Sequence, residues 1–276
     1  MLRMLYRYEN RYYAKIMSLC YLILAGTLLV GRLTYELFRY LEKSLPEDSD
    51  MLVLTSIPMS LVLMLAVLAV FAVLIIPQVL LAVRFWKNLI RDGGYLSLTL
   101  PVKPQAHVGC KIVTAFVWTV ISALVSAAFV AAAVLLFNDE AVETIVEAYR
   151  ALKNAGMYEM IIIFAALAVN GLLYALVTAV RTAFSMSMGQ LTRKNKLLVA
   201  IGSWFGTGVA WDILSSMAYV VAMIPILSAE VSGEAAESVL TEMPILIANA
   251  AVSVIFIVVG WCVSNYVFRN KLNLFK

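Results

Sequence analysis

The sequence predicts an all-α membrane protein with six transmembrane helices, and three observations carry that prediction. Six long apolar stretches recur along the 276 residues, each near or above the roughly 20 residues that a helix needs to cross a bilayer core. Basic residues gather in alternate gaps between the stretches, and acidic residues gather in the other gaps. The chain is also 63% hydrophobic, which is more apolar surface than a soluble domain of this size covers.

The six stretches place approximate transmembrane helices at 14–34, 56–82, 112–137, 159–181, 198–228 and 244–268. Only the second stretch, Met51–Val83, has an ambiguous length. At about 1.5 Å per residue it measures roughly 50 Å as a helix, which suits one tilted crossing and is too short for two. Residues 1–276 are therefore predicted to form a single transmembrane domain.

Two of the segments outside these helices are also predicted to be helical. In residues 1–15, four basic residues spaced four apart form one row beside an apolar row, as in an amphipathic helix on the inner leaflet. In the third gap, Asn138 is a suitable N-cap for a short surface helix that ends at Gly156.

The charge distribution predicts the orientation of the helices. The N-terminal segment, the gaps Arg84–Lys111 and Arg181–Lys196, and the C-terminus together hold 16 of the 21 Lys and Arg residues. The other three gaps hold five basic and 14 acidic residues. Because short loops rich in Lys and Arg stay inside, both termini are expected in the cytoplasm. The basic inner face suits anionic lipid head groups, and nucleic acid is not expected as a partner, since the charges lie at helix ends.

The sequence lacks the parts of an autonomous enzyme. It has no G-x-x-x-x-G-K-[ST] loop for a nucleotide, and His107 is its single histidine. Asp212 is the only acid inside an apolar stretch, whereas an aspartyl mechanism needs two acids that share a proton. No cofactor or metal is expected on this chain, which leaves a carrier, a channel or a subunit driven by a partner.

The fifth predicted helix carries two features. Asp212 lies near the middle of the helix, where an ionised carboxylate costs at least about 2.5–3.5 kcal/mol. Helical spacing places it in a polar stripe formed by Gly208, Asp212, Ser215, Ser216 and Tyr219. The stripe either lines a translocation path, or the acid is protonated or paired with a Tyr, Asn or Arg of another helix, with Asn170 and Tyr174 as candidates. Gly202-x-x-x-Gly206 permits close approach of a helix from the same chain or from a second copy.

The second cytoplasmic gap contains the most distinctive segment. Gly93-Gly94 interrupts the preceding helix, Tyr95–Leu100 alternates apolar and small polar residues, and Pro101 and Pro104 stiffen the exit. Its apolar side chains need a surface to bury against. They either pack on neighbouring helices and lipid, or form a docking element for a cytoplasmic partner.

This segment resembles a motif of the ABC-2 type permease family. The motif begins at Gly94 with the pattern G-Y-L-x-L-T-L-P-V. It continues with a basic residue, Lys103, and ends at Lys111, which opens an apolar helix. The closing residues Arg269–Leu274 also resemble the tails of Gram-positive members. Six helices, inside termini and an amphipathic N-terminal segment match the family from end to end.

The resemblance implies an ABC-2 (type V exporter-like) bundle that is the permease subunit of an ATP-driven exporter in a bacterial cell membrane. A separate cytoplasmic ATPase is expected to bind ATP and Mg, and a second permease copy, identical or similar, is expected to complete a dimer. The predicted coupling loop is centred on Gly93, Gly94, Tyr95, Leu98, Pro101 and Lys103. The basic fourth gap, Arg181–Lys196, is a second candidate contact, or serves only to set topology.

Two other functions fit the sequence. An ion-coupled secondary carrier often contains inverted repeats, but the two halves of this chain show no internal similarity, and Asp212 has no counterpart in the first half. A non-transporting membrane scaffold or assembly factor would tolerate substitution along the polar stripe.

Overall fold

The chain is described by a computed structural model that covers residues 2–44, 50–90, 104–138, 140–154, 157–192, 194–231 and 243–270. Six of the helices in these ranges are long and apolar enough to cross a membrane. The protein is thus an all-α, multi-pass membrane protein, and the predicted number of spans is confirmed.

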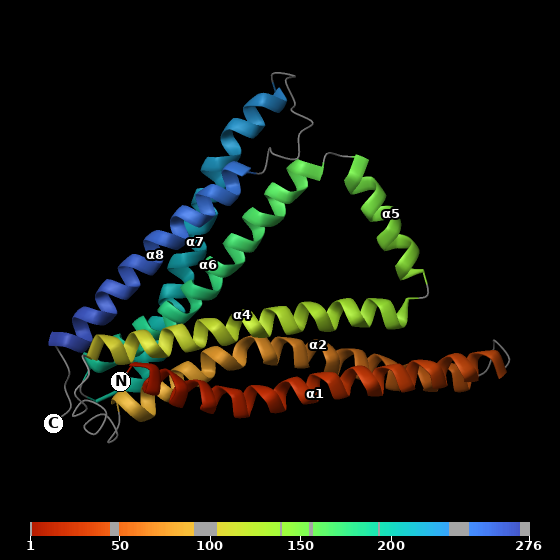
Figure 1. The fold of residues 1–276 in the computed structure, drawn as a ribbon, viewed down its shortest axis with the longest axis horizontal. Coiled ribbons are helices and arrows are strands. Elements are labelled where there is room, and N and C mark those ends of the chain that lie inside the picture. Colours follow the sequence, from red (N-terminus) through yellow and green to blue (C-terminus); the bar gives the residue numbers. More distant parts are fainter. Residues whose placement is uncertain are drawn as a thin grey trace. The chain divides into compact units, whose positions relative to one another are not determined.

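The helices follow one another along the chain (Figure 1). Their bounds are α1 Leu2–Ser44, α2 Asp50–Phe85, the π-helical turn η1 Trp86–Ile90, α4 Pro104–Phe137, α5 Ala141–Asn154, α6 Met157–Gln190, α7 Lys196–Val231 and α8 Met243–Asn270.

Three of these helices differ from their predicted extents. The amphipathic segment and the first span form one continuous helix, α1, because residues 2–25 contain no Pro or Gly to interrupt it. Likewise, α2 continues past Val83 into a π-helical turn that ends at Ile90. Helix α6 runs on to Gln190, so Arg181 lies inside a helix and not at the start of a loop. The fourth gap is therefore much shorter than the predicted Arg181–Lys196.

The predicted N-cap of the short surface helix is confirmed. The side-chain Oδ1 of Asn138 accepts a hydrogen bond from the main-chain N–H of Glu140 at 3.0 Å, and its main-chain oxygen accepts one from Ala141 at 3.2 Å. These contacts satisfy two amides at a helix start, where no earlier turn supplies acceptors. The helix α5 that follows ends at Asn154.

The described chain divides into two compact units. Unit 1 contains Met1–Glu9, Gln78–Val117 and Ala151–Lys276, and unit 2 contains Asn10–Pro77 and Trp118–Arg150. Unit 1 therefore holds α6, α7 and α8 with the starts of α1 and α4 and the end of α2. Unit 2 holds the remaining parts of α1, α2 and α4 and most of α5.

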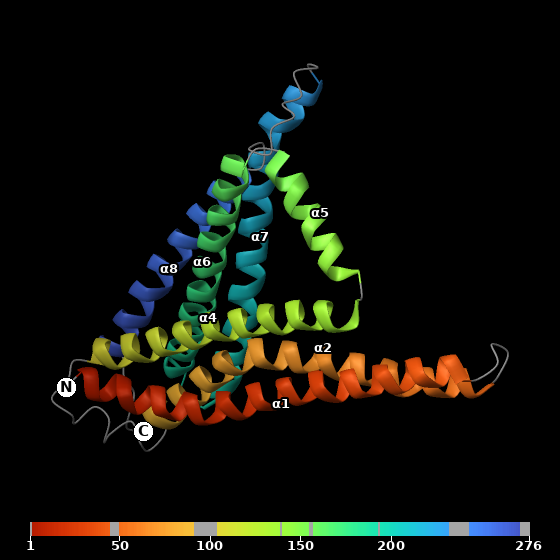
Figure 2. The same ribbon diagram turned by 45° about the vertical axis from the view of Figure 1, so that its right-hand side comes forward.

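In unit 1, α6, α7 and α8 lie side by side, as both views show (Figure 2). Two glycines allow the close approach. A Cβ on Gly260 would lie 2.7 Å from Cγ1 of Val180, and a Cβ on Gly189 would lie 2.6 Å from the main-chain oxygen of Lys196. Gly202 and Gly206 do not have this role in the described chain, since a Cβ on either would meet no atom within 4 Å.

In unit 2, polar side chains join α1 to α4. The hydroxyls of Tyr21 and Ser122 lie 3.0 Å apart, and Nε1 of Trp118 donates to Oδ1 of Asn10 at 2.7 Å. These bonds satisfy groups that would be costly to leave unpaired in an apolar environment.

Candidate functional site

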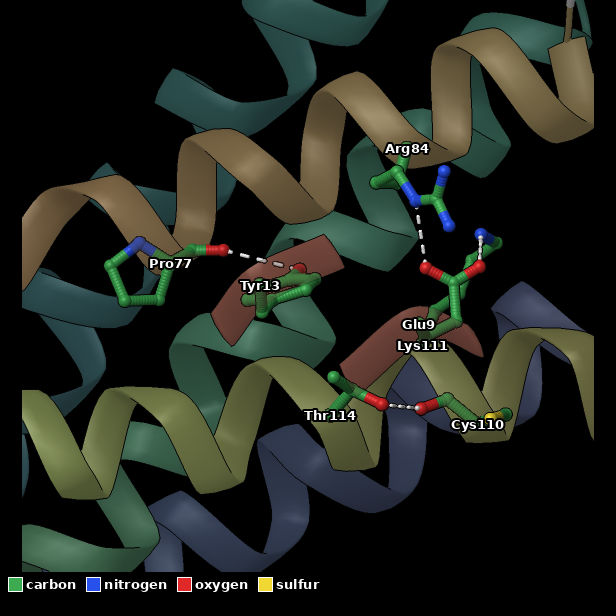
Figure 3. A network of polar contacts seen from close by, with 7 residues as sticks. All are labelled: Glu9, Tyr13, Pro77, Arg84, Cys110, Lys111 and Thr114. Atoms are coloured by element: carbon green, nitrogen blue, oxygen red, sulfur yellow. Dashed lines mark hydrogen bonds and ion pairs between the residues drawn. The ribbon is translucent and has the colours of Figure 1, made fainter. Parts of the chain in front are cut away.

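A buried cluster of charges in unit 1 joins three helices. Glu9 of α1 accepts hydrogen bonds on both carboxylate oxygens, from Nε of Arg84 (α2) at 2.8 Å and from Nζ of Lys111 (α4) at 2.5 Å. The exposed fractions of the three residues are 2%, 7% and 4%. Figure 3 shows the carboxylate lying between the two cations. We call these three residues the Glu9 cluster.

Aromatic and polar neighbours complete the surroundings of the Glu9 cluster. The guanidinium of Arg84 lies 5.0 Å from the centre of the Tyr8 ring, a distance suited to a cation–π interaction. His107, one turn before Lys111 on α4, is buried as well. Charges withdrawn from water are tolerated only when they are paired and hydrogen-bonded. Glu9 therefore holds the ends of α2 and α4 through interactions that are costly to break.

The two cations of the Glu9 cluster lie on either side of the predicted coupling loop. Arg84 is near the end of α2, and Lys111 is two turns into α4. The intervening residues 91–103 contain every residue proposed for that loop: Gly93, Gly94, Tyr95, Leu98, Pro101 and Lys103. All six lie outside the described residues, so their role stays a prediction. The helices that carry the loop are held together by one carboxylate.

A hollow of about 560 Å³ lies at the start of α7. Trp86 of the π-helical turn lines it on one side, and on the other it is lined by Lys194, Asn195, Lys196, Leu197, Leu198 and Ile201. The hollow thus adjoins parts of both segments that the charge pattern predicts to be cytoplasmic. Arg193, the remaining member of the basic run, lies outside the described residues.

Arg181 belongs to the intramembrane site on α6 and α7. Its guanidinium lies 4.2 Å from the centre of the Trp204 ring, and its Nη1 would lie 3.3 Å from a Cβ on Gly208. Asp212 is within electrostatic reach of the same guanidinium. Trp204, Gly208 and Asp212 are spaced four apart and share one face of α7. Arg181, which the charge pattern had placed at the start of the fourth gap, therefore packs against this face of α7.

The proposed partner Asn170 has other contacts. Nδ2 of Asn170 donates to the main-chain oxygen of Leu246 at 3.2 Å, and its Oδ1 accepts from Nδ2 of Asn249 at 3.2 Å. Asn170 therefore joins α6 to α8.

The predicted polar stripe of α7 divides between two environments. Gly208 is buried against Arg181, Ser215 is half-buried, and Asp212, Ser216 and Tyr219 are exposed. The hydroxyl of Ser216 donates to the main-chain oxygen of Asp212 at 2.7 Å, so it is satisfied within its own helix. Within the described ranges, no three His, Cys, Asp or Glu side chains come together as metal ligands.

The Glu9 cluster was not predicted from the sequence, because the basic residues there were interpreted only as markers of orientation. One signal was present, since Glu9 is the single acid among the basic residues of the N-terminal segment. Nothing in the sequence identified Arg84 and Lys111, out of 21 Lys and Arg residues, as its partners.

None of the protein-family models, curated proteins and solved structures compared with this chain matches it. The resemblance to ABC-2 permeases therefore rests on the sequence motifs.

Proposed function

We propose that this chain is the membrane-spanning permease subunit of an ATP-driven ABC-2 type exporter in a bacterial cell membrane. It has both termini in the cytoplasm and no nucleotide site of its own. A separate ATPase subunit binds ATP and Mg, and a second permease copy completes the transporter. Six apolar helices, the charge alternation and the motif from Gly94 to Lys111 support this function.

The observation that carries the proposal is the position of the Glu9 cluster. A loop that transmits the movement of an ATPase must be anchored to helices that move with it. Arg84 and Lys111 precede and follow the loop, and both are bound to Glu9. A displacement of residues 91–103 is therefore passed to α1, α2 and α4 together, because separating any one of them breaks a buried ion pair.

Helix α7 supplies the remaining parts of the proposed transporter. Its polar stripe, with Asp212 exposed, lines the translocation path, since a carboxylate at that depth is far less costly beside water than beside lipid. The open face at Gly202 and Gly206 is available to the second permease copy, because small residues let helices of different chains approach closely.

The test is affinity purification of the tagged chain from its own membranes in mild detergent, followed by assay of ATP hydrolysis and identification of the bound proteins. We expect an ATPase in stoichiometric amount. Tyr95→Asp in the coupling loop should abolish its binding, whereas Tyr149→Asp, the same change at an exposed position of α5, should leave it intact.

Asp212, the single acid inside the apolar stretches of the sequence, favours a second candidate function, an ion-coupled carrier, because intramembrane acids occur in proton relays. Recovery of the chain without an ATPase, together with proton- or sodium-driven flux in liposomes, would refute the exporter and establish the carrier. Loss of that flux in Asp212→Asn would then locate its ion site.

A further inference from the structure

Unit 2 contains an apolar groove that the proposed function does not use. The groove has a volume of about 450 Å³ and lies between α1, α2 and α4. Its lining runs over Thr27–Gly31 of α1, Met59–Phe71 of α2 and Phe129–Phe137 of α4. This volume falls within the roughly 300–1,000 Å³ of small-molecule binding sites.

Side-chain size explains why the groove exists. Ala66 on α2 and Ala133 on α4 are both in the lining, and their short side chains leave the space unfilled. At one end, the ring of Phe137 packs against Gly31, where a Cβ would lie 3.1 Å from its Cζ. The ring of Phe137 therefore bounds the groove near the C-terminus of α4.

The chemistry of the lining selects an aliphatic occupant. Thr27 is the only lining residue with a polar side chain, and its Oγ1 donates to the main-chain oxygen of Leu24 at 2.7 Å. The hydroxyl is thus satisfied within its own helix and does not need a hydrogen bond from a ligand. Leu63, Phe71 and Val130 line the groove and are half exposed or more, so it opens sideways toward the surrounding lipid.

A pair of opposite charges lies beside the closed end of the groove. Arg32, the residue after Gly31, donates to the main-chain oxygen of Leu136 and pairs with Glu36. The side chains of Arg32 and Glu36 are 34% and 51% exposed. Arginine has five N–H donors, so these two contacts leave donors for a phosphate, while the Glu36 carboxylate has capacity for an ammonium group.

We propose that this groove binds one acyl chain of a zwitterionic membrane phospholipid, with the phosphate at Arg32 and the headgroup ammonium at Glu36. Charge complementarity supports this occupant, since a phospholipid of this class carries its two opposite charges next to each other, as the protein does. The site lies wholly within unit 2 and is independent of the proposed ATPase.

The first experiment measures where lipid contacts the chain. The full chain is reconstituted in nanodiscs of phosphatidylethanolamine and phosphatidylglycerol with a trace of phosphatidylethanolamine that bears a photoactivatable acyl chain. Irradiation should label peptides containing Phe71 and Phe129 well above exposed positions elsewhere, such as Val209 on α7. Labelling spread evenly over exposed residues would mean ordinary surface lipid and would overturn the proposal.

A matched pair of substitutions tests the groove directly. Ala133→Trp fills it, whereas Ala131→Trp puts the same side chain on an exposed position of α4 that is outside the lining. Native mass spectrometry of the detergent-purified chain should show retained phosphatidylethanolamine in wild type and Ala131→Trp, and its loss in Ala133→Trp. Equal retention in both variants would refute the site. If Ala133→Trp does not fold, the photolabelling of wild type still decides the question.

Headgroup selectivity tests the role of the charge pair. Wild type should retain phosphatidylethanolamine about tenfold more than a diacylglycerol with the same chains, and Arg32→Gln should remove most of that preference, since a hydrogen bond to a charged group is lost. Retention of phosphatidylglycerol equal to that of phosphatidylethanolamine would overturn the assignment of Glu36 to the ammonium.

Discussion

Removing the negative charge of Glu9 should destabilise the protein strongly. In Glu9→Gln the side chain keeps its shape and one oxygen acceptor, but Arg84 and Lys111, which are 7% and 4% exposed, lose their counter-charge. Breaking a buried ion pair by removing one partner costs about 3–5 kcal/mol, because it leaves an uncompensated buried charge. Since one carboxylate here serves two cations, the loss should lie at the upper end of that range.

The assay is equilibrium unfolding of the purified chain in mixed micelles, with the free energy of unfolding extrapolated to zero denaturant. Glu36→Gln is the matched control, because it makes the same change at the exposed pair with Arg32. Exposed ion pairs contribute only about 0–1 kcal/mol. The two variants should therefore differ by several kcal/mol although each removes one acid.

A double-mutant cycle separates the ion pair from general effects of substitution. Lys111→Met removes one of the two excess cations, so Glu9→Gln combined with Lys111→Met should cost less than the sum of the single changes, by about 0.5–3 kcal/mol. Additive costs, or a Glu9→Gln variant as stable as Glu36→Gln, would show that the cluster does not hold the three helices.

Three further outcomes are expected. Gly260→Ala should lower the free energy of unfolding by about 1–3 kcal/mol, because the new Cβ would meet a valine methyl at 2.7 Å. Gly202→Ala places its Cβ in open space and should raise the free energy of unfolding by about 0.5–1 kcal/mol. Asn138→Ala should remove the N-cap of α5, at a cost of about 1 kcal/mol, and should speed hydrogen exchange in its first turn. In a variant without native cysteines, an impermeant maleimide should label Glu147→Cys in intact cells and Lys194→Cys only after lysis; the reverse pattern would invert the proposed topology.

The sequence predicted the features of this fold that depend on composition and local rules. Six apolar stretches gave the number of spans, and the short helix after Asn138 was predicted from its capping residue and from the apolar face that follows it. The ends of the long helices were less predictable. The predicted helix ended at Arg181 because that residue is charged, yet α6 continues to Gln190, and the Arg181 guanidinium packs on Trp204 and Gly208 of α7.

The Glu9 cluster and the apolar groove of unit 2 could not be predicted from the sequence, and the reason is related. Both depend on which residues from distant parts of the chain meet, and hydropathy gives the depth of a residue without giving its neighbours. In the sequence, Ala66 and Ala133 do not differ from other apolar residues. Their short side chains leave a groove only because α2 and α4 both contribute to its lining. A buried Lys111 carries the same orientation signal as an exposed one.

The Glu9 cluster also has a consequence for biosynthesis. The two cations that Glu9 binds lie 75 and 102 residues after it in the chain. A ribosome delivers Glu9 to the membrane first, and its carboxylate stays unmatched until the start of the third spanning helix has been made. A chain truncated before Lys111 therefore lacks one of the two buried ion pairs that join these helices. The contacts of the Glu9 cluster can thus be completed only after the start of α4 has been synthesised.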